Sequence, residues 1–112
     1  MLNTTMAALS ARVHPTATDM GLTRQRGGAA RGVWWMEMSG RINGVWYEMR
    51  FHEHRDGRLQ VGALGYQPLT MGGRTVVIGS HEYEPEITDR LDRLADDALS
   101  LLDHIRQLES KR

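Results

Sequence analysis

Two hydrophobic periods divide the chain. Between residues 33 and 63 apolar and polar residues alternate, which is the period of a half-buried β-strand. From residue 87 onward the apolar residues recur at spacings of four and three, which is the period of an amphipathic α-helix. The pattern predicts an α+β fold, in which an antiparallel β-meander of about four strands packs against one long C-terminal helix. A short N-terminal helix completes the predicted architecture.

The first hairpin of the meander is specified by both its turn and its pattern. Asn43-Gly44 favours a type I′ turn, because both central positions of that turn need a positive φ. Closing there pairs Ile42 with Val45 and, further along, Trp35 with His52. This register separates an apolar face from a mixed face. The mixed face is predicted to carry Trp35, Glu37, Ser39, Arg41, Trp46, Glu48, Arg50 and His52, with Glu37 opposite Arg50.

The second hairpin has two alternative loops. A two-residue loop at Asp56-Gly57 would send the apolar residues of the third strand to the mixed face. A three-residue loop over 55–57, with Gly57 left-handed, instead pairs Phe51 with Val61 and keeps those residues on the apolar face. The hydrophobic pattern therefore predicts a type I turn followed by a G1 bulge.

The segments that flank the two hairpins are less strongly patterned. Residues 1–13 predict a short helix capped by Thr4 or Thr5 and ended by His14-Pro15, with a mitochondrial targeting segment as the alternative. Residues 16–32 predict a low-order segment, in which 20–26 could add an edge strand. Its end is predicted to be a mobile basic loop that could meet phosphate or carboxylate. The basic residues of that loop are Arg24, Arg26 and Arg31. A fourth strand is predicted over 74–79, with Val76 and Ile78 in the core.

The C-terminal helix is predicted to begin with Pro85 in its first turn. Its apolar stripe has two interpretations, because helix-on-sheet packing and a coiled-coil seam are hard to separate over about 22 residues. In the first, the stripe covers the apolar face of the sheet. In the second, part of the helix overhangs the sheet and meets a second copy, which predicts a homodimer. The stripe consists of Ile87, Leu91, Leu94, Ala98, Leu101, Ile105 and Leu108.

Length and composition bound the remaining choices. At 112 residues the chain predicts a single α+β domain, with an N-terminal helix and flexible Arg/Gly-rich segment over 1–31, a β-meander over 32–80 and a C-terminal helix over 84–110. The absence of Cys excludes disulfides and thiolate sites, and no apolar run reaches the length of a membrane span. We therefore expect a cytoplasmic protein with no cofactor and no membrane association.

The mixed face supplies the main functional hypothesis. Exposed Trp and Arg side chains are typical of protein-binding hot spots. The sequence thus predicts a small non-enzymatic protein-interaction module, of the kind found as accessory or inhibitor proteins in bacteria and phages, provided that residues 1–31 leave this face uncovered. The predicted partner-binding residues are Trp35, Trp46, Arg41, Arg50 and His52.

Two alternatives use overlapping residues. Stacking on the same face, with Arg24, Arg26 and Arg31, would suit single-stranded nucleic acid, and the order of strands followed by a helix is similar to a PC4-like arrangement. The zero net charge disfavours nucleic acid. His52 and His54 share a strand face and could hold a metal in a small metal-dependent enzyme. No motif of a known catalytic class is present, so the sequence favours a role without catalysis.

Overall fold

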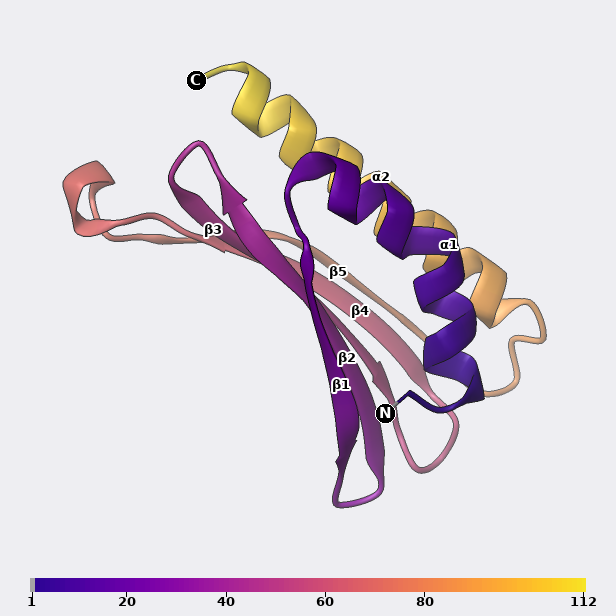
Figure 1. The fold of residues 1–112 in the computed structure, drawn as a ribbon. Helices are drawn as coiled ribbons and strands as arrows, with labels where there is room; N and C mark the ends of the chain where they lie inside the picture. The colour runs from indigo at the N-terminus through magenta and orange to yellow at the C-terminus, as the bar shows by residue number, and fades with distance from the viewer. Residues whose placement is uncertain (1) are drawn as a thin grey trace.

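The computed structural model describes residues 2–112 and has an α+β fold built on one five-stranded antiparallel sheet. The strands follow one another in the sheet in chain order, from β1 to β5. Two helices lie on the same side of this sheet, and the short turn η1 projects from the far end of β4 and β5 (Figure 1). The elements are α1 (Thr4–Met20), β1 (Arg24–Ala30), β2 (Val33–Ile42), β3 (Val45–Glu53), β4 (Leu59–Tyr66), η1 (Leu69–Met71), β5 (Thr75–Tyr83) and α2 (Arg90–Ser110).

The two predicted hairpins are confirmed in register. Ile42 pairs with Val45 across the Asn43-Gly44 turn, and both turn residues have a positive φ of 51° and 82°. In the second hairpin Phe51 pairs with Val61, and Gly57 has a φ of 94°. The hydrophobic pattern selected the correct loop because the register of a two-residue loop, shifted by one residue, would have placed the apolar residues of β4 on the other face.

The segment before the first hairpin does add an edge strand, β1, but over residues 24–30 rather than 20–26, and this strand replaces the predicted mobile basic loop. Residues 24–30 pair with β2 over their whole length, from Arg24 opposite Ser39 to Ala30 opposite Val33. A tight turn at Arg31-Gly32, with φ values of 53° and 81°, closes this hairpin. The sheet therefore spans residues 24–83 rather than the predicted 32–80. The Gly/Ala-rich sequence of β1 gives no strand signal, but the unpaired backbone of β2 supplies the hydrogen-bond partners that hold it as a strand.

The helix α1 is longer than predicted and includes Pro15. Proline removes the hydrogen bond to the carbonyl of Ala11, but both residues are exposed, so water can satisfy that carbonyl. The Asn3 side chain accepts a hydrogen bond from the Met6 backbone N–H at 2.9 Å and caps the helix in place of the predicted threonines. Gly21, with a φ of 112°, ends the helix.

The helix α2 begins at Arg90, five residues after the predicted start at Pro85. The residues between form consecutive turns, with hydrogen bonds from the Ile87 N–H to the Glu84 carbonyl and from the Arg90 N–H to the Ile87 carbonyl. This segment carries the chain from the edge of the sheet, where β5 ends at Tyr83, to the helical layer. The crossing needs an irregular path, which overrides the helical signal of Pro85.

The predicted stripe of α2 packs within the chain. Leu94, Ala98, Leu101 and Ile105 are buried in the core, whereas Leu91 and Leu108 are partly buried at its margin. The other side of the helical layer comes from α1, whose Arg12 forms ion pairs with Asp92 and Asp96 of α2 at 2.8 and 2.9 Å. The stripe residues within α2 thus cover the sheet of their own chain, whereas Ile87, predicted as the first residue of the stripe, lies in the turns before α2. A homodimer through this stripe stays a prediction.

Candidate binding face

The face of the sheet opposite the helices, which we call the open face, is not covered by any element of residues 2–112 (Figure 1). The alternation of the strands places the predicted mixed-face residues on it. The candidate cover was the segment 1–31, and its residues 2–31 lie elsewhere, because α1 packs on the apolar face and β1 extends the sheet sideways. β1 adds Arg24 and Arg26 to the open face, where they lie opposite Ser39 and Glu37.

A ladder of charged side chains crosses the open face from β1 to β3. Arg26 Nη2 lies 3.2 Å from Glu37 Oε1, and Arg50 Nε lies 3.6 Å from Glu37 Oε2. Arg50 Nη2 also lies 2.5 Å from Glu48 Oε2. Trp46 Nε1 donates a hydrogen bond of 2.9 Å to the other oxygen of Glu48. The predicted pair of Glu37 with Arg50 is therefore one step in a longer chain of alternating charges.

Within this ladder the carboxylates lie beneath the guanidinium groups. The side chains of Glu37 and Glu48 are 11% and 12% exposed, whereas those of Arg26 and Arg50 are 52% and 46% exposed. A long Arg side chain can lie along a surface and keep its charge in water, so it can cover a shorter Glu beneath it. The charge that the open face presents to a partner is consequently positive, although the ladder itself alternates.

The two tryptophans of the open face lie at opposite ends of it. Trp35 pairs with His52 and Trp46 pairs with Arg41, so the two positions are about 20 Å apart at ~3.3 Å per residue of β3. The Trp35 indole lies over Gly28 of β1, since a Cβ on that glycine would be 3.4 Å from Trp35 Nε1. The predicted partner-binding residues therefore share one face but do not form one aromatic patch.

Trp46 forms its own cluster at the end of the sheet next to η1. It pairs with Tyr66, which is 38% exposed, and both border a hollow of about 210 Å³ together with Arg41 and Pro68. The nearby Leu69 of η1 is 92% exposed. This end of the open face combines aromatic, aliphatic and cationic groups.

A second hollow of about 210 Å³ lies on the open face across β3, β4 and β5. Its floor is Gly62, which has no side chain to fill the space between the neighbouring strands. A bulge at Ile78 changes the register of β5, so that Ile78 points into the core while Val77, which is 78% exposed, lies beside the hollow. Other residues that line the hollow are Arg50, His52, Gln60, Leu64 and Ser80.

His52 and His54 stack with ring centroids 6.2 Å apart. Burial, followed by the neighbouring His54 and the charge of Arg50, lowers the pKa of His52 below its ordinary value of 6.5. Neutral imidazoles can bind a metal. However, residues 2–112 contain no cluster of three or more His, Cys, Asp or Glu that could hold a metal ion. The His54 ring is instead within hydrogen-bond distance of Gln60 Oε1, at 3.1 Å.

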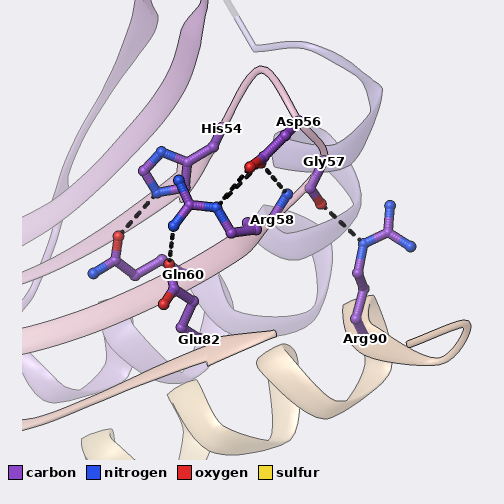
Figure 2. A network of polar contacts seen from close by, with 7 residues as sticks. All are labelled: His54, Asp56, Gly57, Arg58, Gln60, Glu82 and Arg90. Atoms are coloured by element: carbon purple, nitrogen blue, oxygen red, sulfur yellow. Dashed lines mark hydrogen bonds and ion pairs between the residues drawn. The ribbon is translucent and has the colours of Figure 1, made fainter. Parts of the chain in front are cut away.

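The turn between β3 and β4 is held by a polar network (Figure 2). Arg58 lies at its centre, with its Nε 2.9 Å from Asp56 Oδ2 and its Nη1 3.0 Å from Glu82 Oε1. Arg90 Nε donates to the Gly57 carbonyl at 3.2 Å and ties the turn to the start of α2. These contacts hold the turn against β5 and the start of α2.

The sequence placed the mixed face correctly but missed parts of what is now the site. Gly62, Tyr66 and Val77 were not predicted to belong to it, although a glycine between apolar positions of a strand is a signal for a bulge or a missing side chain. Of the three arginines predicted for nucleic acid, Arg24 and Arg26 reach the open face, whereas Arg31 lies in the β1–β2 turn.

The chain matches no protein-family model, no curated protein and no solved structure. The likeness to a PC4-like arrangement therefore rests on the order of elements alone. None of the helices among residues 2–112 is long and apolar enough to span a membrane.

Proposed function

We propose that the protein is a non-enzymatic interaction module that binds a protein partner on its open face. The observation that carries this proposal is the one-sided packing of the fold, in which both helices cover the apolar face and leave Trp46, Tyr66 and Val77 on the other. Accessible aromatic, aliphatic and Arg side chains on one surface are typical of protein-binding sites. An accessory or inhibitor protein that acts by binding to the surface of its partner would need no catalytic group.

Site-specific photocrosslinking tests which surface meets the partner. A photoreactive amino acid at Val77, on the open face, is compared with one at Asp103, whose side chain is 57% exposed on α2. Each protein is irradiated in an extract of its source organism. We expect a discrete crosslinked protein from position 77 that disappears with Trp46→Ala, and none from position 103. Crosslinking from position 103 alone, or from both positions equally, would overturn the proposal.

Single-stranded nucleic acid is the second candidate, favoured by the two arginines, Arg24 and Arg26, that β1 adds to the open face. Bases stack on aromatic rings while cations neutralise phosphates. In this case oligo(dT) would quench the Trp fluorescence at low salt, and the quenching would decline steeply as salt rises. The zero net charge of the chain disfavours strong binding to many phosphates. Unchanged fluorescence at low salt would exclude this function.

A further inference from the structure

We propose that the open face recognises an acidic protein segment, which inserts one aliphatic side chain into the hollow over Gly62. This inference rests on the proposed function and names the chemistry of the partner. The proposed segment would contact both the charged ladder and the hollow. These two features are adjacent, because Arg50 belongs both to the ladder and to the wall of the hollow.

The electrostatic part follows from the charges that remain accessible. Among residues 2–112, Arg24 and Arg41 of the open face have no carboxylate within 4.0 Å, and Arg50 and Arg26 cover the two glutamates of the ladder. At the β5 side, Glu82 is paired with Arg58. The unpaired charge on this surface is thus positive, although the whole chain is neutral. Complementary charge on a partner requires Asp or Glu.

The apolar part follows from the walls of the hollow. Leu64 and Val77 pair across β4 and β5 and flank its open side, and the polar groups of His52, Gln60 and Ser80 lie around it. A space of about 210 Å³ with aliphatic walls suits an aliphatic side chain. The one aromatic ring in this lining is the His52 imidazole, whereas the paired Leu64 and Val77 side chains are aliphatic, which favours an aliphatic side chain over a nucleobase at this position.

The geometry offers a variant that fills the hollow without disturbing the fold. A Cβ on Gly62 would be 3.8 Å from its nearest neighbours, the Gly79 carbonyl oxygen and Ser80 Cβ, which is ordinary van der Waals contact. Gly62→Val should therefore fold and occupy the space. Ala30→Val is the matched control, since it adds bulk to an exposed position of β1 outside the hollow.

Binding is measured with defined peptides by titration into isotope-labelled protein, following the backbone amide signals of β3, β4 and β5. The first peptide has ten residues, mostly Glu and Asp, with one central Leu. The second has Gly in place of Leu, and the third has Lys in place of each acid. We expect the first peptide to shift signals around Gly62, the second to bind about tenfold more weakly, and the third not to bind.

The variants locate the two parts of the interaction. Gly62→Val should weaken binding of the first peptide about as much as loss of its Leu, whereas Ala30→Val should leave it unchanged. Arg41→Gln removes an unpaired charge and should weaken binding about two- to fivefold. Arg106→Gln, on α2, removes the same charge from the helical side and should have no effect.

The inference and the proposed function can fail separately. Equal affinity for the acidic and basic peptides, shifts centred away from Gly62, or no binding of any peptide would overturn the inference. A crosslinked partner from position 77 would in that case still support the proposed function. Stronger binding of oligo(dT) than of the acidic peptide, with shifts on the same face, would overturn both and assign the face to nucleic acid.

Discussion

The two faces of the sheet reach stability by different means, although the same strands build both. Along β3, Phe51 is fully buried beneath the helices, whereas the neighbouring Arg50 side chain is 46% exposed on the open face. On the covered face two helices remove apolar side chains from water. On the open face polar side chains cover one another, so that Glu37 is 8% exposed without any helix above it. A sheet of this kind needs one core and can reserve its second face for binding.

Truncation of side chains should separate the two faces most clearly. Phe51→Ala removes a fully buried ring from the covered face, and we expect a loss of about 3–5 kcal/mol in the free energy of unfolding. His52→Ala, the next residue on the open face, should cost less than about 1 kcal/mol. Urea denaturation followed by circular dichroism measures both. Similar losses for the two variants would show that the open face is packed as tightly as the core.

Gly→Ala substitutions, one on each face, test the same contrast by adding a methyl group instead of removing a side chain. On the covered side a Cβ at Gly40 would be 2.0 Å from the carbonyl oxygen of Gly21, at the end of α1, so Gly40→Ala forces backbone movement. We expect a loss of about 1–3 kcal/mol. Gly62→Ala meets nothing closer than 3.8 Å and should stabilise the protein by about 0.5–1 kcal/mol. Differential scanning calorimetry should show Tm shifts of opposite sign, and shifts of the same sign would contradict the assigned contacts.

Much of the difference between the two faces can be predicted from the sequence, because the turn residues and the hydrophobic alternation of the two hairpins indicate the same register. Asn43-Gly44 and Gly57 fix the turns, and the alternation then assigns each residue of β2 to β4 to one face. Both signals act over a few residues, so neither depends on the rest of the chain. The same logic correctly placed Ile78 in the core and Val77 outside it.

The parts that could not be predicted depend on distant partners. β1 has two glycines and no apolar alternation, and it forms a strand because the edge of β2 is available to pair with it. Pro15 remains in α1 because its missing hydrogen bond faces water, and α2 starts late because the chain first crosses from β5. The hollow over Gly62 also depends on a bulge in β5 at Ile78, for which the following Gly79 is only a weak sequence signal.

The charged ladder offers a smaller test of how the open face stabilises itself. A double-mutant cycle with Arg50→Ala and Glu48→Ala should give a coupling of about 0.5–1 kcal/mol, because the Glu48 side chain is 12% exposed. The matched cycle uses Arg12 and Asp92, whose ion pair between the helices is largely in water. Its coupling should be less than about 0.5 kcal/mol. Unfolding free energies in urea at low and high salt measure both, and equal couplings would show that the ladder is merely a surface pair.

Acidification should slightly lower the free energy of unfolding of the protein through His52, which lies on the open face. Because the pKa of His52 is lowered in the folded protein, the unfolded chain binds more protons as the pH falls through about 6.5. The free energy of unfolding should therefore decrease below that pH and recover above it. His52→Gln should reduce this decrease between pH 7.5 and 5.5, whereas His104→Gln, at an exposed position of α2, should retain it. If His52→Gln and the wild type lose equal stability between pH 7.5 and 5.5, the neighbours of His52 on the open face do not shield its imidazole from water. Only the covered face of the sheet would then exclude water.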